Sequence, residues 1–405
     1  MKKFLSIISA LVLTASAVPA ADVFAQADIP HNGITLTYEI TDGKACITGC
    51  TGSDAIVMIP SEINGSKVTS IKSNAFMGIE ELTAVVIPDS VDSIGDRAFS
   101  ACPLLTTVTL GSGVNEIGSM AFSACPSLES FFVSKDNKTF SVTDKSLFEG
   151  TELVTYAGGS TAEIPVGTVS VRKGAFMGKT NIISVEFPEN GLTSLGDYTF
   201  SGCTSLKKAS IPSSVTYTGI GCFASCYALE DVLFSLNCTS IEDDTFRGCT
   251  SLYNINIPST VTSIGDSAFL GCSGLSGMYI PPTVKELGTD AVGRSYNIRN
   301  EAVETISGFE LHADKGSAAE KYAQSADISV KPFMIGDVNN NGIIEGSDAT
   351  MALRMYTLQS SEAVSEFNAY QTAAADWNND DMITGSDATM ILMEYTHLQS
   401  GVPEV

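Results

Sequence analysis

The feature that most constrains the fold of this chain is a phenylalanine that recurs at nearly constant spacing. The intervals between successive copies are 23, 23, 26, 28, 24, 23, 23 and 23 residues, and Val292 follows 23 residues after the last. The aligned residues are Phe76, Phe99, Phe122, Phe148, Phe176, Phe200, Phe223, Phe246 and Phe269. A fixed period of this size indicates one structural unit stacked on itself. We therefore expect a solenoid.

Each unit carries apolar residues six, nine and eleven positions after the phenylalanine, as in Leu252, Ile255 and Ile257. The last two alternate with polar residues, which predicts a short strand buried on one face. Proline often follows, as Pro258 does here, and it ends the strand because it has no amide hydrogen to donate. Each coil should contribute one short strand and a turn-rich return segment.

The unit VTSIGDSAFLGC at residues 261–272 resembles the BspA-like leucine-rich repeats of bacterial surface and secreted proteins. The resemblance covers about residues 34–330 and implies a leucine-rich-repeat solenoid domain over residues 28–330. It weakens at residues 134–171, where the longer intervals predict a hairpin around residues 148–152. Residues 43–49 and 316–323 resemble the caps of that family.

Six of the ten cysteines occupy the slot three residues after the repeat phenylalanine. They are Cys102, Cys125, Cys203, Cys226, Cys249 and Cys272. Thiols repeated at one slot predict a ladder of small, buried, unbridged side chains. Side chains stacked in parallel are also poorly oriented for disulfides. The states of Cys46, Cys50, Cys222 and Cys238 stay open at this point.

Acidic residues outnumber basic ones by 46 to 22, which gives a formal charge of −24. This balance argues against nucleic acid or an anionic membrane as partner, because both need clustered Lys and Arg. The 3 histidines are too far apart in sequence to offer a local zinc-binding pair. Residues 331–405 hold 11 acidic and 2 basic residues, so the acid is concentrated at this end.

Oxygen-bearing side chains in this acidic segment follow the spacing of a calcium loop. Residues 337–348 place them at loop positions 1, 3, 5, 9 and 12, with the carbonyl of position 7 as a further donor. The pattern returns 39 residues later at residues 376–387, and both copies run into the same sequence, GSDATM. Two copies in phase predict two calcium-binding loops, each followed by a helix.

Position 12 is Asp rather than the Glu of ordinary EF-hands, and the paired loop–helix motifs resemble a small all-α dockerin module over residues 331–405. This resemblance implies two Ca²⁺ ions. The first would be held by Asp337, Asn339, Asn341, the carbonyl of Ile343, Glu345 through water, and Asp348. The second would be held by Asp376, Asn378, Asp380, the carbonyl of Met382, Thr384 through water, and Asp387. Loop position 6, usually Gly because the chain turns left-handed there, is Asp381 in the second loop.

The resemblance also implies a partner, the cohesin module of a scaffoldin or cell-surface anchor. The implied cohesin contacts are Gly346, Ser347, Leu353, Arg354, Gly385, Ser386, Leu392 and Met393. The Gly-Ser pair in both copies implies a pseudo-twofold surface that could dock in two orientations. Arg354 either favours one orientation or is a solvated helix charge.

At the N-terminus, Lys2 and Lys3 precede an apolar run and several small-residue cleavage sites. Residues 1–27 are therefore predicted to be a secretory signal peptide, with an uncleaved anchor as the alternative. The run is short for a membrane span. We expect a secreted protein without direct membrane insertion, attached through cohesin to a cell surface or a cellulosome.

Outward-facing strand positions form the natural binding strip of such a solenoid. Phe132, Tyr253 and Tyr279 are the candidates for holding a protein or carbohydrate ligand, and ordinary cross-strand pairing is the alternative. We call these three residues the ligand strip.

Two functions fit this sequence. The first is a non-catalytic binding scaffold that the dockerin anchors to a polysaccharide-degrading complex. The second is a polysaccharide (O-glycosyl) hydrolase with the same anchor. Against the second, the chain has no G-x-S-x-G or H-E-x-x-H motif, and a regular repeat offers no deep cleft for paired carboxylates. No catalytic residue is predicted.

Overall fold

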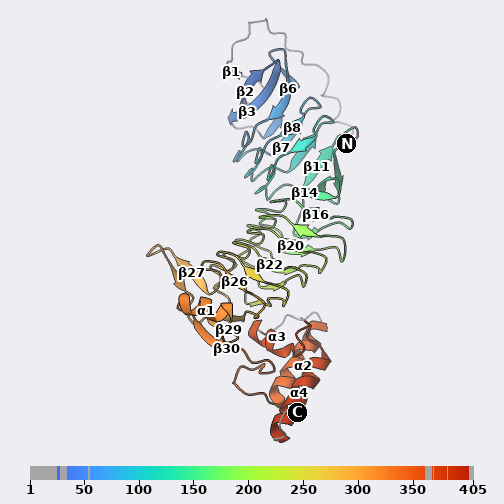
Figure 1. Cartoon of the computed structure of the whole chain (residues 1–405). Coiled ribbons are helices and arrows are strands. Elements are labelled where there is room, and N and C mark those ends of the chain that lie inside the picture. Colours follow the sequence, from blue (N-terminus) through green and yellow to red (C-terminus); the bar gives the residue numbers. More distant parts are fainter. Residues whose placement is uncertain are drawn as a thin grey trace.

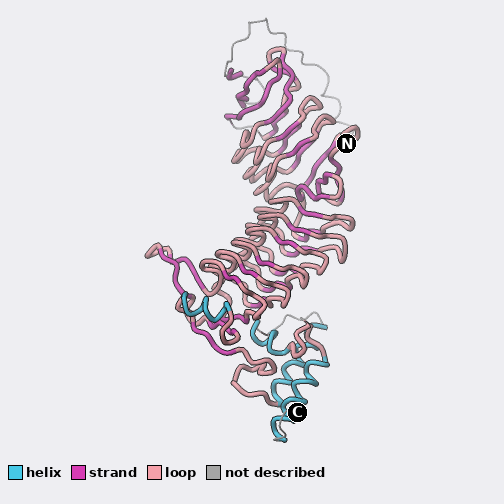
Figure 2. The backbone as a smooth tube through the Cα atoms, in the orientation of Figure 1, coloured by secondary structure: helices cyan, strands magenta, loops and turns pink. Residues whose placement is uncertain are grey.

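The computed structural model describes residues 25–27, 34–52, 55–360, 367, 369–380 and 382–400. Within them, a curved stack of short strands leads into helices at the C-terminal end (Figures 1 and 2). Most of the predicted signal peptide lies outside the described residues, but β1 (Ala25–Ala27) pairs antiparallel with β2 (Ile34–Thr41). No helix in the described part of the chain has both the length and the hydropathy that a bilayer crossing needs.

The first coil is covered by an antiparallel hairpin. β2 pairs with β3 (Lys44–Gly52), whose other edge pairs in parallel with β6 (Ser66–Ile71), and β5 (Glu62–Ile63) joins β6 from the far side. The hairpin contains residues 43–49, the segment that resembles a cap.

Within each of two sheets, the predicted strand of one coil pairs in parallel with that of the next, which confirms the solenoid. The register follows the period, as in Val85 opposite Val108 and Val108 opposite Phe131. One such sheet contains β4 (Ile56–Met58), β7 (Ala84–Ile87), β9 (Thr107–Leu110) and β11 (Ser130–Val133). A second contains β15 (Thr161–Glu163), β17 (Ser184–Glu186), β19 (Lys208–Ser210), β21 (Asp231–Leu233) and β23 (Asn254–Ile255).

Coils also contain a second strand of two residues, which the sequence pattern did not reveal. In most of them the second residue is apolar and buried in the core, as for Ile94 and Ile264. These strands are β8 (Ser93–Ile94), β10 (Glu116–Ile117), β16 (Ser170–Val171), β18 (Ser194–Leu195), β20 (Tyr217–Thr218), β22 (Ser240–Ile241), β24 (Ser263–Ile264) and β26 (Glu286–Leu287). They pair in parallel along a second side of the solenoid.

The repeat phenylalanines stack along the axis, with one correction to the alignment. Phe176 and Phe200 have ring centroids 4.8 Å apart, but the ring stacked on the other side of Phe176 is Tyr156, at 4.9 Å, and not Phe148. Phe148 lies instead in the predicted hairpin, which is confirmed. This hairpin consists of β13 (Ser146–Glu149) and β14 (Glu152–Tyr156), and β12 (Phe140–Thr143) pairs antiparallel with the other edge of β13. Phe148 stays buried in the core, but Tyr156 takes its expected place in the stack of rings.

This irregular coil divides the solenoid core into two clusters of buried side chains. At the division, Lys179 occupies the slot that holds a cysteine in other coils, and its side chain is 1% exposed. Its Nζ donates a hydrogen bond to the carbonyl oxygen of Cys125 at 2.7 Å. Burial lowers the pKa of Lys179 to about 8, so folding at neutral pH has to bury a charge.

Replacing Lys179 with Met should therefore stabilise the protein at pH 7 by about 2 kcal/mol, because the charge penalty of roughly 3 kcal/mol exceeds the lost hydrogen bond. Between about pH 8 and 10.4 the unfolded wild-type state binds a proton that the folded state lacks, so wild-type stability rises with pH and the difference should vanish. Denaturant unfolding at pH 7 and pH 10 measures this. Lys173→Met, in the same coil but half-exposed and paired with Asp197 near the surface, is the control and should shift stability by less than about 1 kcal/mol.

The cysteine ladder donates hydrogen bonds to the preceding coil. The Sγ of Cys102 donates to the carbonyl of Phe76 at 3.2 Å, and that of Cys125 donates to the carbonyl of Phe99 at 3.1 Å. All ten cysteines are free thiols, and only Cys46 and Cys50 are not buried. Burial raises the pKa of Cys226 and Cys272 well above the usual range, which further lowers their reactivity.

A thiol reagent should accordingly modify no more than two groups in the native protein and ten after denaturation without reductant. A count of four or fewer in the denatured protein would contradict the unbridged ladder.

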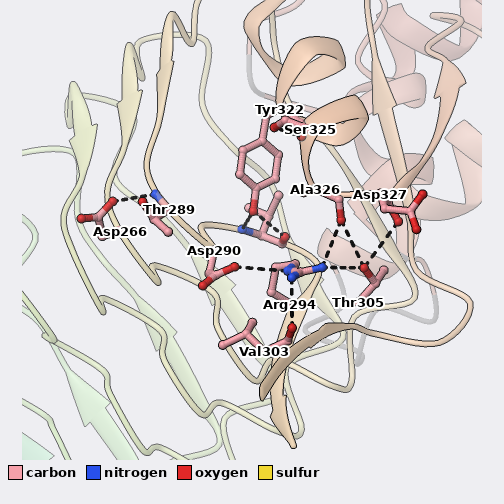
Figure 3. A network of polar contacts seen from close by, with 11 residues as sticks. Asp266, Thr289, Asp290, Arg294, Val303, Thr305, Tyr322, Ser325, Ala326 and Asp327 are labelled. Carbon is pink, nitrogen blue, oxygen red and sulfur yellow. Dashed lines mark hydrogen bonds and ion pairs between the residues drawn. The ribbon is translucent and has the colours of Figure 1, made fainter. Parts of the chain in front are cut away.

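The last coil is closed by a polar cap around Arg294 (Figure 3). The guanidinium pairs with Asp290 and donates to the hydroxyl of Thr305 at 2.7 Å and the carbonyl of Ala326 at 3.0 Å. Tyr322 donates its hydroxyl hydrogen to the carbonyl of Val292 at 2.9 Å. These bonds tie the last coil to the hairpin of β27 (Arg294–Asn297) and β28 (Ala302–Thr305) and to helix α1 (Ala318–Ser325).

A separate three-stranded sheet joins the end of the solenoid to the C-terminal segment. β25 (Gly277–Tyr279) pairs in parallel with β29 (Glu310–Ala313), which pairs in parallel with β30 (Ser329–Pro332). Beyond β30 lie helices α2 (Gly346–Ser360), α3 (Ala369–Ala375) and α4 (Gly385–Ser400). Their own small core includes Val338, Ala352, Tyr370, Ala374 and Ile391.

Candidate metal centre

The first predicted calcium loop leads from β30 into α2 and is folded around two buried carboxylates. Asp337 accepts hydrogen bonds from the amides of Asn341 at 3.0 Å and Gly342 at 2.8 Å. Asp348 accepts from the amides of Asn339 at 2.9 Å and Glu345 at 2.8 Å. The carboxylates at the first and last loop positions, Asp337 and Asp348, therefore both point toward the backbone amides of the loop.

Three further predicted ligands of this loop come together by side-chain contacts. The Oε1 of Glu345 accepts hydrogen bonds from the side-chain amides of Asn339 at 3.3 Å and Asn341 at 3.0 Å. It also accepts from the hydroxyl of Ser347 at 2.7 Å. Ile343, which contributes a carbonyl in the prediction, has an exposed side chain.

The second loop leads from α3 into α4 and repeats this arrangement. Asp376 accepts from the amide of Asp380 at 3.1 Å, and Asp380 accepts from the amide of Met382 at 3.0 Å. Asp387 accepts from both the amide and the hydroxyl of Thr384, at 2.9 and 2.8 Å.

The remaining predicted ligand, Asn378, donates its side-chain amide to Asp380 at 2.9 Å. Left-handed turns at corresponding positions shape both loops, with φ of 58° at Asn340 and 56° at Asn379. Gly342 at position 6 has φ of +87°, a conformation that glycine adopts without strain. Its counterpart, Asp381, lies outside the described residues.

The electrostatics of the first loop favour a cation. Asp337 and Asp348 are 2% and 0% exposed, and within the described residues neither forms an ion pair with Lys or Arg. Burial raises the pKa of Asp348, and the charges of Asp337 and Glu345 raise it further. Two buried carboxylates this close repel each other unless a proton or a cation intervenes.

The donor set fits a hard cation such as calcium, because it consists of carboxylate, amide and carbonyl oxygens. Among the described residues, no three His, Cys, Asp or Glu side chains are gathered at one point. An ion in either loop would therefore also need asparagine and backbone oxygens, as the calcium-loop pattern requires.

Trp377 connects the two loops. Its indole packs on Gly336, where an added Cβ would lie 2.7 Å from the ring. Gly336 immediately precedes the first loop, and its amide donates to the carbonyl of Ala374 at 2.8 Å. The sequence placed Trp377 at position 2 of the second loop but did not predict its contact with the first.

The predicted cohesin contacts lie at the starts of the two long helices, α2 and α4, and further along them. Leu353 is 48% exposed on α2, while Leu392 and Met393 are 47% and 64% exposed on α4. The helix starts are alike, because Thr350 donates its hydroxyl to Gly346 and Thr389 donates its hydroxyl to Gly385. Of the two Gly-Ser pairs, Ser347 contacts the first loop and the amide of Ser386 donates to Thr384.

Arg354 is the predicted contact that distinguishes the two helices. Its guanidinium lies over the ring of Phe367, 5.8 Å from the ring centroid. The charge of Arg354 therefore has a cation–π contact in addition to solvent.

The ligand strip does not present a uniform surface. Phe132 is 60% exposed, whereas Tyr253 and Tyr279 are half-buried. The ring of Tyr279 stacks on Phe333 with centroids 3.6 Å apart. The third member of the strip is therefore covered by the segment that follows β30.

The fold and the two loops define the class: a leucine-rich-repeat solenoid that carries a module of paired EF-hand-like loops and helices. Comparison with known families makes this specific. Residues 58–165 and 169–299 match the BspA type leucine rich repeat region in 6 copies, and residues 335–394 match the dockerin type I domain. The chain belongs to the BspA type leucine rich repeat family, and a type I dockerin follows its repeats. Such dockerins bind calcium and cohesins.

Several solved structures are similar to this chain. The pneumococcal vaccine antigen PcpA is 15% identical, with 77% of this chain and 99% of that chain covered and a TM-score of 0.46. A leucine-rich repeat protein from Eubacterium ventriosum is 18% identical, with 63% and 87% covered and a TM-score of 0.42. A leucine rich cell surface protein from Faecalibacterium prausnitzii is 20% identical, with 70% and 97% covered and a TM-score of 0.34. A comparison with curated proteins finds no match.

Proposed function

We propose that this protein is a secreted, non-catalytic scaffold that calcium-dependent cohesin binding attaches to a cellulosome-type, polysaccharide-degrading complex. The observation that carries the proposal is the pair of loops. Each has buried carboxylates at positions 1 and 12, held by backbone amides, and each leads directly into a helix with exposed apolar residues.

Each loop would hold one Ca²⁺, so two ions are proposed. The ligands would be Asp337, Asn339, Asn341, Ile343, Glu345 and Asp348 in the first loop, and Asp376, Asn378, Asp380, Met382, Thr384 and Asp387 in the second. When bound, the ion supplies the positive charge that the buried carboxylates lack. The residues of the chain then hold each loop closed and fix the start of the following helix.

The cohesin of a scaffoldin or cell-surface anchor would contact α2 and α4. Leu353, Leu392 and Met393 offer the exposed apolar centre of that surface, and apolar side chains in the middle of an interface carry much of the binding energy. The matching starts of the two helices support docking in either of two orientations.

A binding role suits the solenoid better than hydrolysis does. The carboxylates of the neighbouring Asp243 and Asp244 both have structural partners. Asp243 accepts a hydrogen bond from the amide of Asp266, and Asp244 forms an ion pair with Arg247. A surface cavity of about 360 Å³ beside the cap contains one carboxylate, Asp290, which pairs with Arg294. Glycoside hydrolysis generally needs two facing carboxyl groups. A protein or carbohydrate ligand on the repeats is therefore the proposed alternative to catalysis.

Trp377 provides the test. Calcium added to the chelator-treated full-length protein should change its fluorescence, since Trp377 belongs to the second loop and its indole packs on Gly336, next to the first, and chelator should reverse the change. Binding to an immobilised cohesin should show the same calcium dependence. Unchanged emission together with calcium-independent binding would contradict the dockerin proposal, and release of reducing sugar from a plant polysaccharide would contradict the non-catalytic role.

A further inference from the structure

The dockerin is not joined to the solenoid by a free linker. β30 is hydrogen-bonded to β29 along its length, and Lys331 of β30 pairs with Glu310 of β29 at 2.9 Å. Phe333 follows β30 directly, and Asp337, the first predicted calcium ligand, comes four residues later. The path from the last coil to the first calcium loop is thus short and paired for most of its length.

Four rings fill the junction between the two domains. Tyr279 and His312 come from neighbouring strands of the solenoid, opposite each other in register. Phe333 stacks on Tyr279 at 3.6 Å, and Tyr370 of α3 lies 4.1 Å from the ring centroid of His312 and 5.8 Å from that of Phe333. We call these four residues the aromatic seat. Figure 1 shows α3 beside the C-terminal end of the solenoid, and α3 also contacts β25.

The side chains of the seat are suited to a tight contact. Burial lowers the pKa of His312 to about 4, so this imidazole is neutral near pH 7 and packs without a charge. The Nδ1 of His312 and the hydroxyl of Tyr370 are buried and have no hydrogen-bond partner among the described residues. Such unpaired polar atoms cost free energy, and the packing of the four rings has to outweigh that cost for the contact to form.

The seat is also connected to the first calcium loop. Phe333 lies four residues before Asp337, the first predicted ligand of that loop. The amide of Gly336 donates to Ala374, one turn after Tyr370 on α3. Helix α3 has only 7 residues and is too short to be stable without its contacts. Repulsion between the buried carboxylates of an empty loop would therefore disturb both dockerin rings of the seat.

We propose that the aromatic seat holds the dockerin in one fixed orientation on the last coil, and that calcium in the first loop stabilises this contact. The inference rests on the proposed calcium function of the loops. Leu353, Leu392 and Met393 take no part in the seat, so cohesin can bind while the seat is closed. Because cohesin binding is itself proposed to need calcium, a cohesin-bound protein would then present its repeats at one set angle.

Thermodynamic linkage gives the test an independent readout. If calcium strengthens the seat, the seat must strengthen calcium binding by the same factor. Tyr279→Ala, which alters only the solenoid side, should then weaken calcium binding at one of the two sites by about fivefold or more, within the usual range of such coupling. Tyr279→Phe keeps the ring and should bind calcium as the wild type does. Tyr253→Ala removes a half-buried tyrosine of the same strip outside the seat and should also leave calcium affinity unchanged.

Calorimetric calcium titration of the full chain measures these affinities. Hydrogen–deuterium exchange of residues 329–336 and 369–375 reports the seat itself. In the wild type, calcium should slow exchange there about tenfold or more, and Tyr279→Ala should remove most of that protection while the repeats keep theirs. Wild-type calcium affinity and exchange in Tyr279→Ala would overturn the seat. Absence of any calcium binding by the wild type would instead overturn the proposed function, so the two failures are distinguishable.

Discussion

Simultaneous replacement of Asp348 and Asp387 with alanine should abolish calcium-dependent cohesin binding. Both side chains are 0% exposed and close their loops by accepting two or more hydrogen bonds each. Each single replacement should lower calcium affinity at its own site by more than about 100-fold, because changes to residues that merely support a metal ligand already cost roughly 10- to 100-fold. Calorimetry gives the affinities, and surface-immobilised cohesin gives the binding.

Glu394→Gln on α4 is the matched control, since it removes an acid of the same module that is not a predicted ligand, and it should bind calcium normally. Thermal melting shows whether the solenoid is still folded in the double variant. The melting temperature of the repeats should be unchanged, except for any contribution from their contact with the dockerin. Calcium-dependent cohesin binding at wild-type strength by the double variant would refute the ligand assignment.

The second large effect concerns the aromatic stack. Phe200 is 0% exposed and lies between Phe176 and Phe223, with centroid distances of 4.8 and 5.3 Å. Phe200→Ala should lower the free energy of unfolding by about 3 to 5 kcal/mol, because it removes buried apolar surface and leaves a cavity that neighbouring coils cannot fill. Urea unfolding followed by circular dichroism measures this change.

Phe132→Ala is the corresponding control, since its ring is 60% exposed and an exposed substitution usually changes stability by less than about 0.5 kcal/mol. Equal losses in the two variants would mean that the stack does not carry the stability of the repeats. The control also tests the ligand strip, because Phe132→Ala should weaken ligand binding without unfolding the protein.

The parts of the fold that repeat could be predicted from the sequence, because a period exposes positions that share one environment. The buried strand residues and the cysteine slot were recognisable for this reason, and so were the two calcium-type loops. The short second strands were not, since two residues carry too little pattern to be distinguished from a turn. Phe148 was misaligned because counting along the chain cannot tell which ring fills a slot when a hairpin is inserted.

The aromatic seat could not be predicted for a related reason. Tyr370 lies 39 residues after Lys331 and Phe333 lies 39 residues before Thr372, so neither ring has a counterpart in the other dockerin copy. Tyr279 looked like an outward-facing strip residue because the repeat pattern says nothing about what covers the last coil. Contacts that occur once, between domains, leave no periodic trace in a single sequence.

The division of the core has a mechanical meaning. A scaffold held by cohesin at one end and by a ligand at the other carries tension along the axis of its coils. The stack of rings is interrupted between Phe122 and Tyr156, and there the coils are bridged by polar contacts such as Ala124 to Met177 at 2.7 Å and Lys179 to Cys125 at 2.7 Å. Under load we expect this joint to yield before either half loses its own core, and single-molecule stretching would then show two extension steps.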